Sequence, residues 1–476
     1  MNPALVHAPL AAWALSRAAE PALQSAACTL SFAQLQAAVL ARSQRCQHLG
    51  QGAYVPVDAR LPAVQRIADF LGIVASGRCA VVTDPDWPAP ARAAVEHALA
   101  QLSQETFAGD AQADTTFYLG FTSGSSGVPK GYRRSHGSWT SSFQACVQAF
   151  GEAVRGRILA PGNDAHSLFL FAALLGVWSG GGVALQERFS AAASLAALQG
   201  GDIACLVMVP SQLLLLLQLA RQRACAAIPT LRLVLISGAF WSRAHNAALR
   251  ALFPEARIVE FYGASETSFI AWTESDESAD ANLVGQLFPG VQLRIQALPA
   301  DPRQGLIFVR SPMLFQGYVG AANDDPSAAL RDGDWLSVRD LGYLDAQQVL
   351  HLTGRQNRML VTRGKNVFPE EVESALMAHP AIAQASVHAL PDALRGARIA
   401  ALLLPRPDTP LPSAQALRAW CRQRLDTVKT PRQFLTCTRW RQTPAGKTDH
   451  RALAALLQSW AVGEAPHGEA CLNLLR

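Results

Sequence analysis

The feature that most constrains this chain is a series of short apolar runs, each long enough for one buried strand and each ending in a Gly, Ser or Thr turn. Within residues 115–263 the runs are TTFYLGF, GGVAL, ACLVMV, RLVLISG and RIVEFYG. Helix-like stretches, such as FAQLQAAVLARSQRCQHL, alternate with short apolar runs from the start of the chain. This alternation predicts an α/β fold. In open α/β sheets, the turns at the carboxyl ends of strands are where ligands bind.

The pattern changes after about residue 281. Up to residue 352 the elements are shorter and punctuated by Gly and Pro, as in VGQLFPGVQLRI and GLIFVR, which predicts β-meanders. Further on, EEVESALMAHPAI is expected to form a helix, and ASVHAL and RIAALLLP are expected to form strands. A chain of 476 residues exceeds what one hydrophobic core usually supports. Because polar GRQNR separates the two regions, we expect an N-terminal domain over 1–354, a hinge at 355–357 and a small C-terminal domain over 358–476.

Composition excludes several classes of protein. Half of the residues are hydrophobic and 16% are charged, which indicates an ordered globular chain. The net charge is only +5 and Lys and Arg are scattered, so no nucleic-acid partner is expected. The longest apolar stretches, 168–178 and 203–217, fall short of the roughly 18 residues of a membrane span. The nine cysteines form no CxxC pair and the N-terminus has no cationic leader, so we expect a cytoplasmic protein with reduced thiols.

The strand FYLGF runs directly into TSGSSGVPKG, residues 122–131, which holds three glycines, four hydroxyls and one Lys. Glycines allow several backbone N–H groups to point into one concavity, and the hydroxyls add donors, so the loop suits a phosphate. It does not match the Walker A pattern, because Pro129 stands where that pattern needs Gly. A flexible Ser/Gly surface loop is the alternative interpretation.

Four further segments follow this loop in order: FYGASET (261–267), GDWLSVRDLGYLD (333–345), LTGRQNR (352–358) and TPAGKTD (443–449). With these five motifs the chain resembles the adenylate-forming superfamily of acyl- and aryl-CoA synthetases, nonribosomal-peptide adenylation domains and luciferases, and within it the acid:CoA ligase branch. The resemblance covers roughly residues 30–455. It implies a large N-terminal domain of α/β subdomains plus a β-rich subdomain, followed by a small mobile α+β C-terminal domain.

The resemblance implies a two-step reaction. A small-molecule carboxylic acid attacks the α-phosphate of ATP with the help of Mg²⁺, pyrophosphate leaves, and the acyl-adenylate is then opened by the thiol of coenzyme A. Catalysis of the first step is mostly positioning and charge stabilisation. Two alternatives stay open: a stand-alone adenylation enzyme that loads a carrier-protein phosphopantetheine in trans, and a non-catalytic nucleotide-binding relative.

The resemblance assigns the β- and γ-phosphates to the Ser/Gly loop. The loop residues concerned are Thr122, Ser123, Gly124, Ser125, Ser126, Gly127 and Lys130. In FYGASET, Tyr262 stacks on adenine beside Gly263, and Thr267 donates to the α-phosphate. Glu266 is the expected ligand of Mg²⁺, together with Thr122, since this hard cation prefers oxygen. A Tyr-Gly turn with a solvated Glu is the alternative for this motif.

Further nucleotide contacts are expected on either side of the hinge. Asp340 accepts hydrogen bonds from the ribose hydroxyls, a role that needs an ionised two-oxygen acceptor. The chain departs from the family here, because Val338-Arg339 replaces the usual Thr-Gly or Ser-Gly. Arg355 pairs with phosphate or ribose oxygens at the domain border. Asn357 is the expected pivot, a position where Asp or Lys is common.

Lys447, in PAGK, is expected to neutralise charge as the acid attacks the α-phosphate. Gly364, in GKNVFPEEVE, is expected to lie against pantetheine in a second conformation, or simply to form a tight turn before a helix.

SGAF at 237–240 resembles the segment that borders adenine and the acyl pocket, through Gly238 and Ala239. His166 falls where relatives place a His or aromatic residue near the reacting carboxylate, although a structural His is the alternative. Five aromatic residues are candidates for the acyl pocket or for ordinary core: Phe169, Phe171, Trp178, Phe240 and Trp241.

Overall fold

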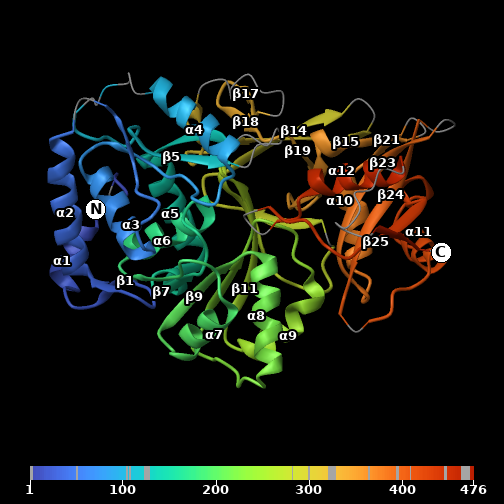
Figure 1. Ribbon diagram of the computed structural model, residues 1–476, viewed down its shortest axis with the longest axis horizontal. Helices are drawn as coiled ribbons and strands as arrows, with labels where there is room; N and C mark the ends of the chain where they lie inside the picture. The colour runs from blue at the N-terminus through green and yellow to red at the C-terminus, as the bar shows by residue number, and fades with distance from the viewer. Residues whose placement is uncertain are drawn as a thin grey trace.

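The computed structural model describes residues 4–49, 52–102, 106, 109–122, 129–280, 282–298, 301–319, 328–362, 365–392, 396–407, 409–443, 447–462 and 472–475. The molecule is elongated: the N-terminal elements lie at one end, the elements after residue 360 lie at the other, and a green lobe lies between them (Figure 1).

Among the described residues, fifteen strands belong to one continuous sheet. In order across the sheet they are β17 (Leu330–Asp332), β18 (Trp335–Ser337), β15 (Asp301–Arg310), β19 (Asp340–Leu344), β20 (Leu350–Arg355), β13 (Leu283–Leu287), β12 (Ser268–Glu274), β11 (Arg257–Ala264), β10 (Leu233–Ile236), β9 (Ile203–Met208), β7 (Arg157–Ala160), β8 (Val183–Leu185), β1 (Pro21–Gln24) and β2 (Thr29–Ser31), with β14 (Gln292–Leu298) paired to β15. Along this order, β11, β10, β9, β7, β8 and β1 pair in parallel. The outer strand β2 pairs antiparallel with β1, and the strands from β12 to β17 pair antiparallel. The parallel part therefore presents its carboxyl ends to one edge of the molecule.

A second, smaller sheet carries the Ser/Gly loop. Its order is β16 (Gly317–Tyr318), β6 (Lys130–Ser135), β5 (Thr116–Thr122), β4 (Cys79–Val81) and β3 (Tyr54–Pro56). Strands β5 and β6 are antiparallel neighbours, and Thr122 pairs with Lys130. The loop between them thus begins and ends at one point of the sheet.

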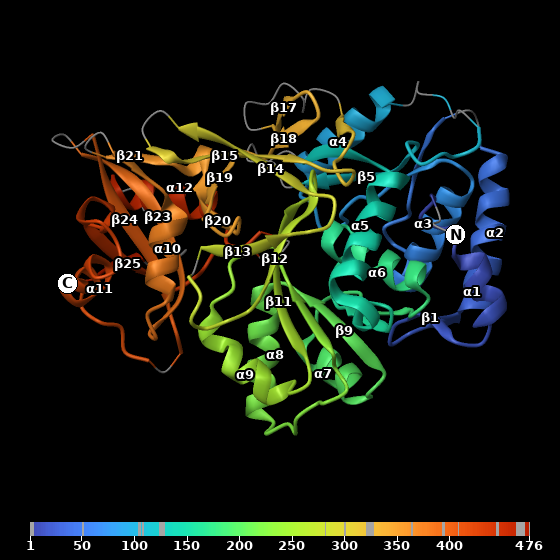
Figure 2. The ribbon, with the colours of Figure 1, turned by 180° about the vertical axis from the view of Figure 1, so that it is seen from behind.

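Helices of the N-terminal part pack on these sheets. They are α1 (Leu10–Ser16), α2 (Phe32–Gln47), α3 (Ala63–Ala75), α4 (Ala89–Leu102), α5 (His136–Phe150), α6 (Ser167–Ser179), α7 (Ala191–Gln199), α8 (Pro210–Gln222) and α9 (Asn246–Leu252). The local sequence determines where several helices begin. Ser31 and Gln34 form a capping box for α2, Ser135 caps α5, and Pro210 is the first residue of α8. Figure 2 shows α5 and α6 side by side next to the sheets. The largest core fills this region, with Phe70, Phe117 and Phe143 fully buried.

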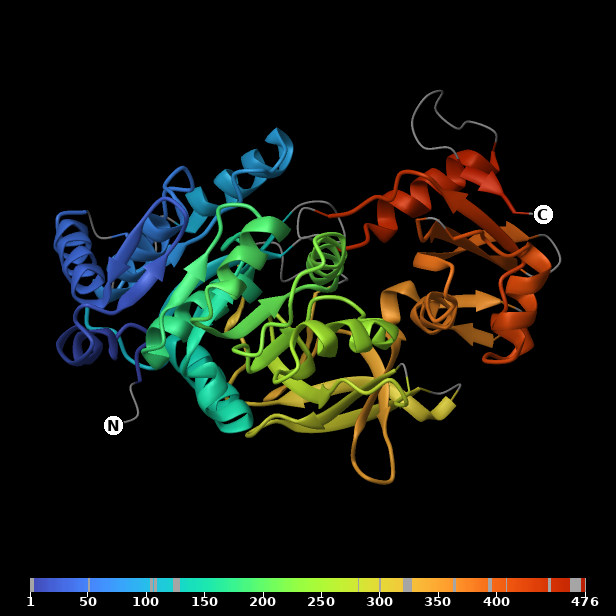
Figure 3. The same ribbon diagram turned by 90° about the horizontal axis from the view of Figure 1, so that it is seen from below.

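The C-terminal part has a sheet and a core of its own. Its sheet runs β23 (Ile382–Asp392), β24 (Gly396–Pro405), β25 (Gln433–Cys437) and β26 (Leu472–Leu474); a hairpin of β21 (Leu360–Thr362) and β22 (Lys365–Val367) precedes it, and its helices are α10 (Pro369–Met377), α11 (Ala414–Arg422) and α12 (His450–Ala461). Figure 3 shows this part at one end of the molecule. Within the described residues its two core clusters draw only on residues after 359. A small cluster of Leu306, Phe308, Leu341 and Phe368 joins it to the rest.

The predicted α/β fold class is confirmed. The five apolar runs become β5, β8, β9, β10 and β11, the meander region becomes β13–β20, and the expected C-terminal helix and strands are α10, β23 and β24. The predicted hinge falls where β20 ends and a 3₁₀ turn, Gln356–Arg358, begins. The exact division into 1–354, 355–357 and 358–476 stays a prediction. Across the described residues, the helices are too short or too polar to cross a bilayer, and the eight cysteines described there are free.

Candidate functional site

A cavity of about 1090 Å³ lies between the carboxyl ends of β10 and β11 and the C-terminal part. The N-terminal wall includes residues 236–241 and 260–263, the β-rich wall includes residues 352–355, and the opposite wall includes residues of α10 and Lys447. We call this space the interdomain cleft. It occupies the edge at which parallel sheets bind ligands.

Asp340 is the acidic centre of the cleft. It is 3% exposed, accepts a hydrogen bond from the Tyr262 hydroxyl at Oδ2 (2.7 Å), and pairs with Arg355 Nε through Oδ1 (2.9 Å). Strands β19 and β20 place Asp340 and Arg355 opposite each other as register partners. Burial, and then the charge of Asp340, raises the pKa of Tyr262, whereas Asp340 raises the pKa of Arg355. The Asp340 carboxyl group is therefore oriented by two partners, as an acceptor for hydroxyl groups must be.

Lys447 reaches the same cleft from the C-terminal part. Its backbone is held by hydrogen bonds with Thr443, at 2.7 Å to its carbonyl and 3.3 Å from its amide, and α12 follows three residues later. A Cβ added at Gly238 would lie 3.5 Å from Lys447 Cε and 3.2 Å from Val209, and Gly238 has φ +89°. Glycine thus leaves the lysine stem room beside the end of β10.

The surroundings of Lys447 lower the pKa of its ammonium group. Burial among the cleft walls, and then the positive charge of Arg355, lowers its pKa to about 8, although Glu266 and Asp340 act in the opposite direction. Lys447 also keeps exposed surface in the open cleft, so water there partly screens these effects. The ammonium is the dominant form below pH 8.

This pKa predicts an alkaline limit for any reaction that needs the Lys447 ammonium. The group is charged below about pH 8 and loses its proton above it, so kcat/KM is expected to fall as pH rises through about 8. The measurement is acid-dependent ATP–pyrophosphate exchange between pH 6 and 10. In Lys447→Arg the residual exchange rate should not show this alkaline fall, because guanidinium stays protonated. An unchanged alkaline fall in that variant would assign the titration to another group.

Tyr318 connects Glu266 to strand β6, which begins at Lys130. The Tyr318 hydroxyl donates to Glu266 Oε1 at 2.8 Å, and Tyr318 pairs with Tyr132 of β6, two residues beyond Lys130. Lys130 is 7% exposed and lies on the same face of β6 as Tyr132. The expected phosphate lysine and the expected metal-ligand glutamate are therefore anchored to one strand. Thr122, partly buried, stands across from Lys130.

Glu266 fits the ligand set that Mg²⁺ uses when a substrate supplies phosphates, namely one or two carboxylates with water and phosphate oxygens. Within the described part of the chain, His, Cys, Asp and Glu side chains form no group of three that could hold a metal alone. A magnesium ion at this position would draw most of its ligands from the substrate.

Three of the four predicted catalytic residues do not line the interdomain cleft: Glu266, Thr267 and His166. Thr267 is fully buried, and its hydroxyl accepts from the Ala264 amide (3.1 Å) and donates to the Ser268 carbonyl (3.4 Å), so it closes its own turn. His166 precedes α6 and lines a second cavity of about 1330 Å³. The assigned roles of Thr267 and His166 stay predictions, and the structure does not bring His166 together with Lys447.

The remaining predicted residues divide into three groups. Ala239, Gly263 and Phe240 line the cleft, and a Cβ at Gly263 would lie 1.9 Å from the Ser268 carbonyl oxygen, so only glycine fits that turn. Phe169 lines the second cavity, whereas Phe171 and Trp178 belong to aromatic core packing, the alternative interpretation. Trp241 is buried in the core and also lines the interdomain cleft. The others lie outside the described residues: Ser123, Gly124, Ser125, Ser126, Gly127 and Gly364. For Asn357 the backbone alone is described, in the 3₁₀ turn.

Sequence reasoning missed Arg134. Its guanidinium is 1% exposed and donates to the Ser265 carbonyl (2.7 Å), the Ser268 hydroxyl (2.5 Å), the Met313 carbonyl (2.7 Å) and Ser138 (3.2 Å). Burial lowers its pKa to about 10, which keeps it charged at neutral pH. It thus holds both sides of the turn that carries Glu266. Strand alternation was the available signal, since Arg134 shares a face with Tyr132.

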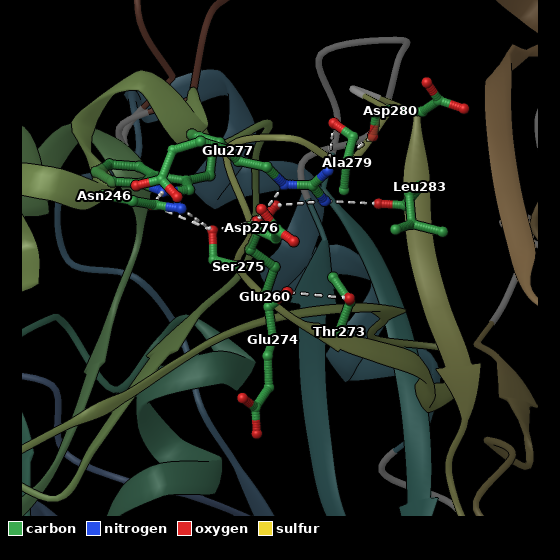
Figure 4. A network of polar contacts seen from close by, with 12 residues as sticks. Asn246, Glu260, Thr273, Glu274, Ser275, Asp276, Glu277, Ala279, Asp280 and Leu283 are labelled. Atoms are coloured by element: carbon green, nitrogen blue, oxygen red, sulfur yellow. Dashed lines mark hydrogen bonds and ion pairs between the residues drawn. The ribbon is translucent and has the colours of Figure 1, made fainter.

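Sequence reasoning also missed Arg243, which holds the floor of the cleft. It pairs with Glu260 (2.7 Å) and donates to the carbonyls of Asp280 (2.7 Å) and Leu283 (2.9 Å). Figure 4 shows these three residues converging on one guanidinium, with Asn246 and Ser275 bonded beside them. The bonds fix the middle of β11 relative to the start of β13. The partners lie up to 40 residues away in sequence, so no local pattern reveals them.

Comparison with known proteins agrees with this arrangement. The family model described as AMP-binding enzyme matches residues 59–319, and the model of the AMP-binding enzyme C-terminal domain matches residues 371–447. The chain is 34% identical over 336 residues, 70% of its length, to a Bacillus subtilis protein named as an uncharacterized acyl–CoA ligase, YhfT. It is 33% identical over 60% of its length to VraA of Staphylococcus epidermidis, named as a putative long chain fatty acid–CoA ligase. The matches span 66% and 60% of those proteins' own lengths.

The fold also matches solved structures. One is o-succinylbenzoate CoA synthetase (MenE) of Bacillus subtilis in complex with its acyl-adenylate intermediate, with a TM-score of 0.77, 23% identity, and coverage of 93% of this chain and 97% of that one. At this identity the likeness concerns the fold. The family model matches more than half of the chain and its partner model matches the C-terminal part, so the predicted resemblance is confirmed: this chain belongs to the AMP-binding enzyme family.

Proposed function

We propose that this chain is an AMP-forming acid–thiol ligase. It activates a carboxylic acid with ATP to an acyl-adenylate, releases pyrophosphate, and transfers the acyl group to the thiol of coenzyme A. The observation that carries the proposal is the convergence of Lys447 from the C-terminal part with Asp340, Arg355 and Gly238 from the N-terminal part in one cleft. An ammonium delivered to a nucleotide site has an evident use in stabilising charge at a phosphate under attack.

Each cleft residue has a role in this proposal. Asp340 accepts the ribose hydroxyls, and Tyr262, whose hydroxyl it already holds, provides a ring beside adenine. Arg355 and Lys447 face the α-phosphate, where negative charge accumulates as pyrophosphate leaves. The Ser/Gly loop and Lys130 hold the β- and γ-phosphates. Glu266, with Thr122, would hold Mg²⁺, which supplies charge neutralisation between the phosphates when bound.

Fewer observations support the second step, the transfer of the acyl group to coenzyme A. The relatives named as acyl–CoA ligases support coenzyme A as acceptor, and GKNVFPEEVE supports it by resemblance. Because the match spans two thirds or less of those relatives, the acid, the acceptor and the whole activity are part of the proposal. We also propose a cytoplasmic location, since reduced thiols are typical of that compartment.

The test is ATP–pyrophosphate exchange by the purified chain with panels of fatty, aryl and hydroxy acids, followed by product analysis with coenzyme A. We expect exchange that depends on one class of acid and an acyl-CoA product that depends on ATP. Exchange without acyl-CoA, but with transfer to a phosphopantetheinylated carrier protein, would replace coenzyme A as the acceptor. Absence of exchange with every acid, together with undiminished ATP binding, would make the chain a nucleotide-binding relative.

A further inference from the structure

Arg339, directly before Asp340, has a backbone that arginine rarely adopts. Its φ is +66°, in the left-handed region that glycine enters freely and other residues enter at a cost. A residue other than glycine persists there only when surrounding contacts hold it. The contacts of Arg339 are therefore informative.

The side chain of Arg339 connects two segments. Nε donates to the Ala328 carbonyl at 2.9 Å, and Nη1 donates to Gln356 Oε1 at 3.1 Å. The Arg339 carbonyl also accepts from the Gln356 amide at 2.9 Å, and its own amide donates to the Ser337 hydroxyl at 3.1 Å. Arg339 and Gln356 are thus bonded twice, once through the backbone and once through the side chains. Glycine at 339 would keep the first bond and lose the second.

These bonds lie where the two parts of the molecule join. Arg339 lies directly before Asp340 and Gln356 directly after Arg355, so both border this register pair, and Gln356 opens the 3₁₀ turn that leads into the C-terminal part. At the other end of this turn, Arg358 is paired with Glu370 (2.9 Å) and Glu373 (2.6 Å) of α10. The turn is therefore fastened to the N-terminal part by Arg339 and to the C-terminal part by Arg358.

The parts have separate main cores, so relative movement about the short connection is expected. Arg358 and its partners can move together with the C-terminal part. A change in the backbone angles of Gln356 would disturb both of its bonds to Arg339. One further polar contact between the parts, Arg406 with His245 (3.1 Å), does not involve the turn.

We propose that Arg339 and Gln356 form a latch that holds Lys447 in the interdomain cleft, so that Arg339 is a positioning residue favouring acyl-adenylate formation. The latch rests on the proposed function only for its effect on rates. Its effect on the turn does not depend on which acid the protein activates.

Arg339→Gly and Arg339→Asn test the latch, because both residues accept the backbone angle and neither reaches both acceptors. We expect acid-dependent ATP–pyrophosphate exchange to fall about tenfold, the value of one hydrogen bond to a charged group, while acyl transfer from supplied acyl-AMP keeps its rate or rises. Gln356→Ala should have the same effect, and the double variant should be no worse than either single one. Gln348→Gly is the matched control, since Gln348 also has positive φ (+61°) but is exposed on a turn after β19.

Hydrogen exchange of the peptide that contains residues 356–358 gives a readout that needs no activity. Exchange there should quicken in both Arg339 variants and stay unchanged in Gln348→Gly. Any of three results would overturn the latch: hydrogen exchange in the Arg339 variants at the wild-type rate, equal loss of both half-reactions, or additive effects of the Arg339 and Gln356 changes. If the wild-type protein supports no acid-dependent exchange of pyrophosphate, the proposed function fails, while hydrogen exchange still decides for or against the latch.

Discussion

Replacement of Lys447 by alanine is expected to lower acid-dependent ATP–pyrophosphate exchange by about 10²–10³-fold, the effect of removing one preorganised charge-stabilising group from a reaction centre. The Lys447 side chain lies beside Gly238, where an added Cβ would be 3.5 Å from Lys447 Cε, in the cleft that also holds Asp340 and Arg355. The loss should appear in kcat more than in KM for ATP, because the interaction grows as charge develops on the α-phosphate. Transfer from supplied acyl-AMP to coenzyme A should be largely spared, since that step breaks the acyl–phosphate bond after pyrophosphate has left.

Lys429→Ala is the matched control for this change. Lys429 belongs to the same C-terminal part and is held by Glu371 at 2.7 and 2.8 Å. Its loss should change the exchange rate by less than a factor of about five, as for other partly exposed ion pairs. An undiminished exchange rate in Lys447→Ala would remove the lysine from the adenylation step. Equal loss of both half-reactions would instead indicate damage to the whole cleft.

Replacement of Arg134 by methionine is expected to destabilise the N-terminal part by about 3 kcal/mol, because buried acceptors that lose their donors cost roughly 1–3 kcal/mol each. The carbonyls of Ser265 and Met313 would lose their charged donor. Ser268, whose φ is +55°, would lose the bond that helps to hold its turn. We also expect pyrophosphate exchange to fall, since the same turn carries Glu266. The measurement is the midpoint of urea unfolding, followed by the exchange assay under conditions in which the variant is folded.

Arg310→Met provides the comparison for Arg134. Arg310 is exposed at the end of β15 and bonds Gln292 at 2.9 Å, so its loss should change stability by no more than about 0.5 kcal/mol. The stability of Arg134→Lys should lie between those of Arg134→Met and Arg310→Met, because an ammonium keeps the charge but cannot serve four separate acceptors. An unfolding midpoint of Arg134→Met that equals the wild-type midpoint would show that the buried oxygens do not depend on this guanidinium.

Much of the fold could be predicted because local patterns coincide with the tertiary arrangement. The five apolar runs are strands in the structure because each is long enough to span a buried layer, and the turn after β10 and the later residues of β11 border the cleft. Asp340, Arg355 and Lys447 could be predicted from their motifs, and they are brought together although more than 90 residues separate Lys447 from Arg355.

The residues that escaped prediction act through long-range contacts. Arg243 and Arg134 bond backbone carbonyls distant in sequence, and an arginine in a strand or loop does not reveal which carbonyls it meets. The α-phosphate role of Thr267 stays a prediction, and in the structure its hydroxyl bonds the backbone of its own turn, which the motif did not indicate. Arg339 stood out as a departure from the family pattern, but its positive φ and its bond to Gln356 are properties of the folded chain.

The position of Lys447 beside the capped start of α12 has a mechanical consequence. Asp449 accepts from the Ala452 amide at 2.9 Å, so the lysine sits next to a fixed helix end rather than in the middle of a free segment. In the proposed latch, the Gln356–Arg358 turn would serve as a fulcrum and the C-terminal sheet with α12 as a lever arm. A modest change of dihedral angles at the fulcrum would then displace the Lys447 ammonium by a larger distance. One backbone joint would thereby deliver or withdraw the charge that we propose to act in adenylation, without any rearrangement of the cleft walls on the N-terminal side.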